Sequence, residues 1–187
     1  MPARKQITKE KILSAALDVL REKGEGALSI LNITKKLSCS TQPIYYAFSG
    51  MDELRCAVMD EARKIYDGYT ARELEGKKDK IYMCYGMAYL RFAREEPEAF
   101  KMLYLRRRSE EEKKKDEDSL DGVIKLISSL CSLTPENAYR FHSEMWIYVH
   151  GLAVSLATSF LTLDDDILRE MLTHQFIGLK YVYGVKG

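Results

Sequence analysis

Apolar side chains recur every three to four residues along most of the chain, which is the period of an α-helix. The apolar stripe of the first such stretch consists of Ile12, Leu13, Ala16, Leu17 and Leu20. Comparable stripes predict further helices over residues 30–37, 42–48, 51–75, 77–96, 98–106, 119–132, 135–161 and 164–183. The sequence has no strand-like alternation and no internal repeat. The pattern therefore predicts an all-α protein of about nine helices.

Capping residues mark several of the predicted helix ends. Thr8 is expected to cap the first helix and Gly24 to end it, while Ser29 caps the second helix. Pro43 is compatible with the third helix if Ser40 is its N-cap. The proline then occupies the third helical position, where an N–H would have no partner within the helix.

A highly charged run separates the sixth and seventh predicted helices. The residues RRRSEEEKKKDED (106–118) mix both signs of charge, and we interpret them as a solvated, disordered connection. Downstream, Thr134-Pro135 is typical of a helix start, because proline at the first helical position needs no N–H partner. The last helix is predicted to begin at Thr162 or Asp164.

One stretch is long enough to raise the question of a membrane span. No charged residue occurs between Met145 and Leu163, which is about the length that crosses a bilayer. The stretch nevertheless contains Tyr148, His150, Gly151, Ser155, Thr158, Ser159 and Thr162. We therefore interpret it as a buried core helix and expect no membrane partner. The beginning of the chain, MPARKQITKEK, lacks the apolar region of a signal peptide.

The composition is that of an ordinary globular chain with a mild asymmetry of charge. Of 187 residues, 46% are hydrophobic and 30% charged, which excludes collagen-like and strongly charged disordered chains. The net charge is +1, but residues 1–50 hold 8 basic and 4 acidic side chains, whereas residues 51–187 hold 21 and 24. A basic first segment hints at a polyanionic partner for that segment, although so small an imbalance also arises by chance.

The sequence offers little chemistry for an enzyme. Its three histidines, His142, His150 and His174, do not fall in the HExxH or ExxH spacing of metal sites, and no GxSxG or P-loop motif is present. The four cysteines form no CxxC pair: Cys39, Cys56, Cys84 and Cys131. We therefore expect no catalytic activity, no metal and no cofactor, and a reducing cytoplasm as the location.

The two short predicted helices within residues 29–48 form the most informative part of the chain. Short helices joined by a few residues after a longer helix are typical of a tri-helical helix-turn-helix unit. Ile44 and Phe48 would anchor the second short helix to the core. The outward residues are then Thr41, Gln42, Tyr45 and Tyr46, which can bond base edges and phosphates. The alternative is that these are ordinary surface residues.

Residues 8–60 resemble the N-terminal domain of the TetR family of transcriptional regulators. The resemblance rests on ILSAALDVLREKG (12–24) and SILNITKKLSCSTQPIYYAFSGMDEL (29–54). The matching positions are Ser29, Ile30, Ile33, Tyr45, Phe48, Asp52, Glu53 and Leu54. In the C-terminal part, Trp146, His150 and Gly151 are similar to a Trp…His-Gly motif of one subgroup of that family.

The resemblance implies a DNA-binding domain over residues 1–50 and a ligand-sensing, dimerising helical bundle over residues 51–187. The helix at 51–75 would connect the two. The residues predicted to contact DNA are Ser29, Lys35, Lys36, Ser40, Thr41, Gln42, Pro43, Tyr45 and Tyr46. Arg4 and Lys5 would form an arm that reaches the minor groove.

Three positions depart from the family pattern. Ser38 stands where the turn usually has glycine, and Ala47 stands where a histidine often follows the two tyrosines. Met51 replaces a lysine that often precedes the acidic pair of the connecting helix. A phosphate contact would then come from helix N-terminal N–H groups or from Lys35 and Lys36.

Two further sites follow from the resemblance and from residue spacing. An apolar ligand pocket is expected to include Tyr85, Tyr89, Phe92, Met102, Phe141, Met145 and Trp146, although core packing alone also explains such residues. Gly151, Ser155 and Ser159 recur every four residues and would let another helix approach closely, either within the subunit or across a dimer interface. Phe176 is assigned to the same interface.

The function predicted from the sequence is that of a one-component transcriptional regulator, most simply a repressor. A homodimer would place residues 42–48 of each subunit in the major groove of double-stranded DNA, at a pseudo-palindromic operator. A small-molecule effector would bind in the bundle and move the two reading heads apart. The alternatives are an all-α ligand-binding protein that has lost DNA binding, and a helical-bundle enzyme.

Overall fold

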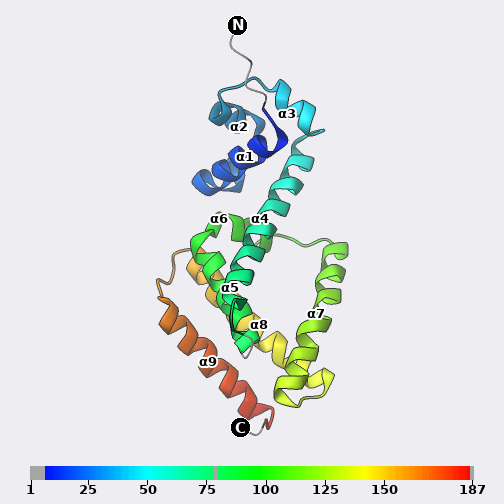
Figure 1. Ribbon diagram of the computed structural model, residues 1–187, viewed down its shortest axis with the longest axis vertical. Coiled ribbons are helices and arrows are strands. Elements are labelled where there is room, and N and C mark those ends of the chain that lie inside the picture. Colours follow the sequence, from blue (N-terminus) through cyan, green and yellow to red (C-terminus); the bar gives the residue numbers. More distant parts are fainter. Residues whose placement is uncertain (1–6, 78–79, 186–187) are drawn as a thin grey trace.

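The computed structural model describes residues 7–77 and 80–185, and these contain nine α-helices and no strand (Figure 1). The helices are α1 (Lys9–Lys23), α2 (Ile30–Leu37), α3 (Gln42–Ala47), α4 (Met51–Leu74), α5 (Ile81–Glu95), α6 (Pro97–Tyr104), α7 (Glu110–Cys131), α8 (Pro135–Ala157) and α9 (Asp165–Val182). A short 3-10 helix, Glu25–Ala27, joins α1 to α2. The predicted all-α class is confirmed.

Helices α1, α2 and α3 pack together at one end of the molecule, and the predicted caps of the first two are confirmed. The Thr8 side chain accepts a hydrogen bond from the backbone N–H of Lys11, and Ser29 accepts one from Asn32. Gly24 ends α1 with a φ of 77°, a left-handed conformation that favours glycine.

Helix α3 begins at Gln42, as predicted, but its predicted N-cap is wrong by one residue. Thr41, not Ser40, is the N-cap, and neither residue's side chain caps the helix. Pro43 therefore occupies the second helical position, where an N–H would also lack a partner within the helix. The helix ends at Ala47, and Phe48 continues in extended backbone, so its ring turns back into the core, where it is buried.

Helix α4 begins at Met51, as predicted, and extends from the α1–α3 unit deep into the rest of the molecule (Figure 1). Asp52 and Glu53 lie in its first turn, where acidic groups complement the helix dipole. Leu54, Val58 and Ala62 are fully buried along one side. The buried residues of both ends of the molecule belong to one contiguous hydrophobic cluster.

The prediction of a disordered connection over residues 106–118 is wrong. Ser109 and Glu112 form a reciprocal capping box, and α7 runs without a break from Glu110 to Cys131. Arg106 donates hydrogen bonds to the Glu112 carboxylate from outside the helix. Local ion pairs and a cap stabilise this charged half of the helix, whose residues otherwise contribute little to the core.

The body contains α5 through α9, with α5 packed against α4, α6, α8 and α9. The predicted stretch 77–96 begins later than expected, at Ile81, and its residues 78 and 79 lie outside the described part. Helix α8 ends at Ala157 rather than near Leu161, because the chain turns at Thr158 and Ser159. The φ of Ser159 is 56°. Asp164 caps α9 by accepting the N–H of Ile167.

An ion-pair network joins the far end of α4 to α5 and α9. Glu73 on α4 is almost fully buried, with 2% of its surface exposed, and its carboxylate pairs with Arg91 on α5. Arg91 also pairs with Asp165 at the start of α9, and Arg94 lies 2.8 Å from the same carboxylate. The network therefore fixes the body end of α4 to two other helices.

Within residues 7–77 and 80–185, no helix combines the length and apolar character that crossing a lipid bilayer requires.

Candidate DNA-binding surface and ligand cavity

Buried side chains on the core-facing side of α3 fix its position. Ile33 on α2, Ile44 on α3 and Phe48 just after it are each at most 2% exposed. The ammonium of Lys9, on α1, lies 4.7 Å from the centre of the Phe48 ring. A helix of only six residues is not stable alone, so these contacts hold it in a defined orientation.

The turn between α2 and α3 takes the left-handed conformation that glycine usually supplies. Ser38 has a φ of 51° and a ψ of 48°, and its N–H donates to the carbonyl of Lys35 at 3.2 Å. The N–H of Cys39 closes the end of α2 on the carbonyl of Thr34 at 3.1 Å. The departure from the family pattern at Ser38 thus changes the residue but leaves the turn in place.

The outer edge of α3 is exposed and carries no acidic side chain. Tyr45 is 59% exposed and Tyr46 is 81% exposed, and Thr41 and Gln42 are exposed beside them. The Gln42 side-chain amide donates a hydrogen bond to the Tyr46 hydroxyl at 2.9 Å. These four predicted residues therefore form one polar and aromatic surface, which we name the α3 edge.

The other predicted DNA contacts are placed less uniformly. Lys35 and Ser40 are exposed, whereas Pro43 is half-buried and Ser29 is occupied in capping α2. The ammonium of Lys36 lies 2.6 Å from the carboxylate of Glu22 on α1. That ion pair partly neutralises the charge of Lys36. Lys35 is therefore the more available of the two lysines for a phosphate contact. Arg4 and Lys5 lie outside the described residues.

Two features near the α3 edge are missing from the sequence-based prediction. Lys11 on α1 lines a shallow hollow together with Ser38, Gln42 and Tyr46. Glu53 accepts hydrogen bonds from the backbone N–H and hydroxyl of Ser49, at 2.7 and 2.8 Å, which lowers the pKa of its carboxyl group. This carboxylate lies at the start of α4, where a phosphate contact was expected. Only the fold brings these residues beside α3.

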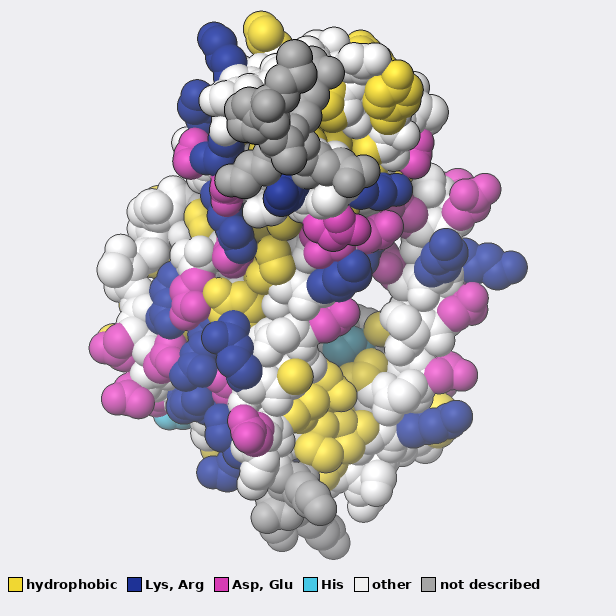
Figure 2. All heavy atoms as spheres, turned by 45° about the horizontal axis from the view of Figure 1, so that its top comes forward, with side chains coloured by type: hydrophobic (Ala, Val, Ile, Leu, Met, Phe, Trp, Pro, Cys, Tyr) yellow, Lys and Arg dark blue, Asp and Glu magenta, His cyan; other side chains and the backbone are white. Residues whose placement is uncertain are grey.

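A cavity of about 580 Å³ lies in the body, between α4, α5, α6, α7 and α8. Its lining consists of Tyr66, Tyr82, Tyr85, Gly86, Tyr89, Tyr104, Ser119, Leu120, Gly122, Val123, Leu126, His142, Met145, Trp146 and Val149. In the space-filling view a hollow opens below the α1–α3 unit, with hydrophobic side chains and a histidine inside it (Figure 2). Its volume falls in the range of small-molecule sites.

Four of the seven predicted pocket residues line this cavity: Tyr85, Tyr89, Met145 and Trp146. The other three do not: Phe92, Met102 and Phe141 are buried in the core with at most 1% of their surface exposed. An amphipathic pattern tells which face of a helix is buried but not whether that face meets another helix or a cavity. Tyr66 and His142 were missed for the same reason.

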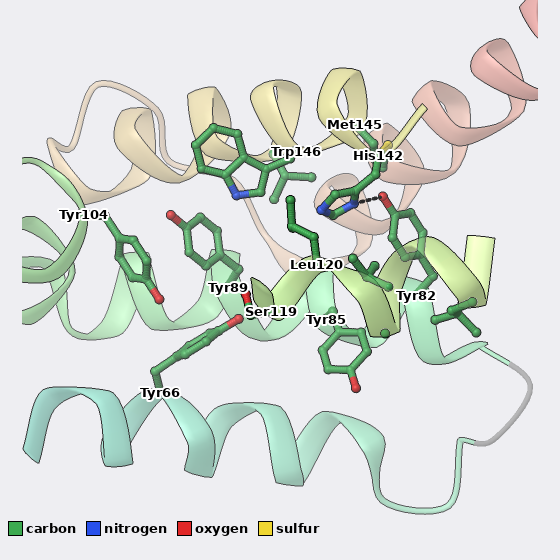
Figure 3. A pocket seen from close by; sticks show the side chains of 15 residues that line it. Tyr66, Tyr82, Tyr85, Tyr89, Tyr104, Ser119, Leu120, His142, Met145 and Trp146 are labelled. Carbon is green, nitrogen blue, oxygen red and sulfur yellow. Dashed lines mark hydrogen bonds between the residues drawn. The ribbon is translucent and has the colours of Figure 1, made fainter. Parts of the chain in front are cut away.

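Two tyrosine–histidine hydrogen bonds connect α5 to α8 beside the cavity. The hydroxyl of Tyr82 lies 3.0 Å from Nδ1 of His142 (Figure 3). The hydroxyl of Tyr89 lies 2.9 Å from Nδ1 of His150. Burial lowers the pKa of both imidazoles and raises the pKa of both phenols. All four groups are therefore uncharged near neutral pH, and the histidine tautomer decides which partner donates in each bond.

The residues predicted for a dimer interface do not share one surface. Gly151 and Ser155 are accessible on α8, with no atom within 4 Å of the position that a Cβ on Gly151 would take. Ser159 lies beyond the end of α8, so it does not continue the four-residue period. Phe176 points inward, where its ring packs 5.8 Å from Tyr82 and 5.3 Å from Phe141. For Phe176 the structure thus indicates packing within the subunit.

Exposed apolar side chains on α8 and α9 were not predicted as an interface. Ile147 on α8 is 65% exposed, and Ile177 and Tyr181 on α9 are 56% and 85% exposed. We name these three residues and Gly151 the α8–α9 face. Single exposed apolar residues are normal, but several on two adjacent helices are typical of a protein–protein interface.

Metal ligands are not grouped anywhere in the described part of the chain, where no three His, Cys, Asp or Glu side chains are placed to share an ion. All four cysteines are free thiols.

The architecture described so far is that of an all-α helix-turn-helix protein with a helical body and an internal cavity. Solved structures show that it is the fold of TetR-family regulators. A TetR-like transcriptional regulator from Rhodococcus sp. RHA1 is similar with a TM-score of 0.68 and 18% identity, over 89% of this chain and 92% of that one. A TetR variant from Acinetobacter baumannii AYE, in complex with minocycline, is similar with a TM-score of 0.63 and 15% identity, over 94% and 97%.

A sequence comparison gives a relative of the same kind. An uncharacterised HTH-type transcriptional regulator of Bacillus subtilis (strain 168), YobS, is 23% identical over 179 residues, which are 91% of this chain and 90% of that protein. A multidrug binding protein, EbrR, solved in complex with imidazole, shares the fold with a TM-score of 0.58 and 18% identity, over 89% of this chain and 88% of that one. The comparison with models of protein families finds no match.

Proposed function

We propose that this chain is a TetR-like transcriptional regulator, acting as a repressor. It binds a pseudo-palindromic operator as a homodimer and is released by a small molecule in the body cavity. In this proposal residues 1–50 bind DNA, and residues 51–187 sense the ligand and form the dimer. The observation that carries the proposal is the α3 edge, an exposed surface without acidic groups on a short helix with a rigid base.

The chemistry of the α3 edge suits the major groove of DNA. Gln42 can pair with the edge of an adenine, and tyrosine hydroxyls can bond phosphate oxygens. The exposed Lys35 adds a phosphate contact whose strength falls with added salt. We assign no catalytic role to any residue, and the proposed function consists of binding DNA and a small molecule.

The α8–α9 face supports the dimer. A second copy related by a two-fold axis would cover Ile147, Ile177 and Tyr181 on both subunits at once, since such an interface is self-complementary. Gly151 leaves room beside these residues for close approach of the partner's helices. Two reading heads at a fixed separation then explain why the operator would be pseudo-palindromic.

The cavity couples to DNA binding through α4. Tyr66 on α4 lines the cavity, and the same helix continues to the α1–α3 unit. A ligand that favours one position of α4 changes the separation of the reading heads. By linkage, the ligand and the operator then reduce each other's affinity by the same factor.

The test is binding to the intergenic DNA that flanks the gene, followed by nuclease footprinting. We expect a protected inverted repeat, tighter binding there than to random DNA, and an affinity that falls steeply with salt. The variant Tyr45→Ala, Tyr46→Ala is expected to lose the protection and to remain folded. Equal binding to flanking and random DNA at every salt concentration would contradict the proposal.

A second candidate is a ligand-binding protein of this fold that no longer binds DNA. Ala47 and Met51 favour it, because they replace residues that often contact DNA in the resembling family. The same footprinting experiment separates the two candidates.

A further inference from the structure

The cavity in the body has a lining that selects by charge. None of its lining residues is an aspartate, glutamate, lysine or arginine. Its one titratable nitrogen base, His142, is neutral because burial lowers its pKa, and its Nδ1 is already paired with Tyr82. An ion of either sign would therefore lose part of its hydration shell in this cavity without meeting a counter-charge among the lining residues.

Ring faces enclose one end of the cavity. Tyr66 on α4, Tyr89 on α5 and Tyr104 on α6 are mutually edge-to-face, with ring centres 5.0 to 6.3 Å apart. Trp146 on α8 lies opposite, as Figure 3 shows. Its indole stacks on the His150 ring at 4.9 Å and 7°, and its other face meets no ring of the described residues. A planar aromatic ligand would fit these surroundings by stacking and edge-to-face contact.

A cation is disfavoured although ring faces can attract one. The guanidinium of Arg108 lies 5.7 Å from the centre of the Tyr104 ring and already occupies that interaction. A second positive charge beside Tyr104 would be repelled by the first. An anion is disfavoured by the partial negative charge on the ring faces, and the Arg108 guanidinium that could attract it lies 3.7 Å from the carboxylate of Asp116.

The polar groups still available in the cavity include hydrogen-bond donors on aromatic rings. The hydroxyls of Tyr82 and Tyr89 are used by the two histidines. Among the described residues, no hydrogen-bond partner is recorded for the Tyr104 hydroxyl or the indole N–H of Trp146. The indole nitrogen of the 48% exposed Trp146 can only donate, so a ligand that covers it must offer an acceptor such as a carbonyl oxygen.

We infer that the cavity binds an uncharged, planar aromatic compound that carries a carbonyl or similar acceptor, held between Trp146 and the three tyrosines. The inference rests on the proposed function in taking this cavity as the effector site. It goes beyond that function in naming the chemical class of the effector.

Three probes with one ring skeleton test the inference: 2-acetylnaphthalene, 2-naphthoate and (2-naphthyl)trimethylammonium. They differ in charge and share the planar naphthalene. Because Trp146 is the one tryptophan of the chain, quenching of its fluorescence reports on the cavity, and calorimetry gives an independent Kd. We expect the neutral ketone to bind at least roughly tenfold more tightly than either ion.

Substitutions locate the binding. Tyr104→Phe keeps the ring and removes the hydroxyl, so affinity for 2-acetylnaphthalene should fall about 3- to 10-fold, whereas affinity for plain naphthalene should not change. The matched control is Tyr139→Phe, at an exposed tyrosine on α8 that does not line the cavity. It should leave both affinities as they are.

Several outcomes would overturn the inference: no binding of any probe, equal or tighter binding of an ion, or a Kd that Tyr104→Phe and Tyr139→Phe leave equally unchanged. The inference and the proposed function fail separately. If the protein releases operator DNA only in response to a charged compound, the regulator stands and the ligand class falls. If the ketone binds as expected but no DNA is recognised, the ligand class stands and the regulator falls.

Discussion

Single residues in strained or buried positions determine much of the local behaviour. Ser38 takes a left-handed conformation that glycine adopts without steric cost. We expect Ser38→Gly to raise the free energy of unfolding by about 0.5–1 kcal/mol, measured by urea denaturation. Ser14→Gly, at an exposed position inside α1, is the control and should lower it by about 1 kcal/mol. Destabilisation by Ser38→Gly would contradict this account of the turn.

The two buried imidazoles make stability depend on pH in a defined range. His142 and His150 have a lowered pKa in the folded protein because burial disfavours their charged form. As pH falls below the ordinary value of about 6.5, the unfolded chain takes up protons before the folded one, so stability is lost. Urea midpoints at pH 7.5 and 5.5 should show this loss.

The double variant His142→Gln, His150→Gln serves as the control for that pH dependence. Its urea midpoint should vary less between pH 7.5 and 5.5 than that of the wild type, because glutamine does not titrate. The lowered carboxyl pKa values, such as that of Glu112, act only in more acidic solution. An unchanged pH dependence in the double variant would show that other groups are responsible.

At the scale of elements, the sequence predicts a helix start well where a capping residue precedes an apolar stripe, and poorly where the stripe is absent. Thr8, Ser29 and Asp164 lie next to clear apolar stripes, so their helices were predicted nearly to the residue. The first half of α7 was missed because it has almost no apolar stripe. Its start depends on Ser109 and Glu112, a pair that a search for hydrophobic period does not weigh.

The start of α7 gives an element-scale prediction. Arg106 and the backbone N–H of Ser109 lower the pKa of Glu112 to about 2. Glu112→Gln should therefore lower the free energy of unfolding by about 1–2 kcal/mol at pH 7. The difference should disappear as pH falls from about 4.5 towards 2, since Glu112 then becomes protonated. Exposed Glu111→Gln, in the same turn, should change stability by less than about 0.5 kcal/mol.

The cavity could be predicted only in part at this scale. Tyr85, Tyr89, Met145 and Trp146 were found because aromatic and sulfur-containing residues gather on two helices. Tyr66 was not found, because its place in the cavity depends on how α4 crosses α5. Crossing angles are set by packing of side chains from several elements, and a single stretch of sequence does not contain them.

At the scale of the whole molecule, the buried carboxylate of Glu73 connects elements far apart in the chain. It pairs with Arg91, with Lys77 at 3.2 Å and with Arg169 at 3.6 Å. Glu73→Gln should lower the free energy of unfolding by roughly 2 kcal/mol, because partly buried guanidinium groups lose their partner. Exposed Glu75→Gln is the matched control, and equal urea midpoints for the two variants would contradict the assigned role.

The α8–α9 face gives a prediction about assembly. A buried carboxylate without a partner is costly, so Ile177→Asp should convert the proposed dimer to a monomer in sedimentation experiments and weaken operator binding. Lys125→Asp, at an exposed position on α7, should leave the sedimentation coefficient unchanged. If wild-type protein already sediments as a monomer at micromolar concentration, the dimer is wrong.

Helix α4 acts geometrically as a lever. Its 24 residues span about 36 Å at 1.5 Å per residue, with one end held by the Glu73 network and the other beside the α1–α3 unit. A rotation of roughly 5° about the held end would displace the far end by about 3 Å. An adjustment of that size is comparable to the spacing between neighbouring base pairs, so in the proposed dimer a change in the cavity too small to alter the fold would put the two reading heads out of step with their half-sites.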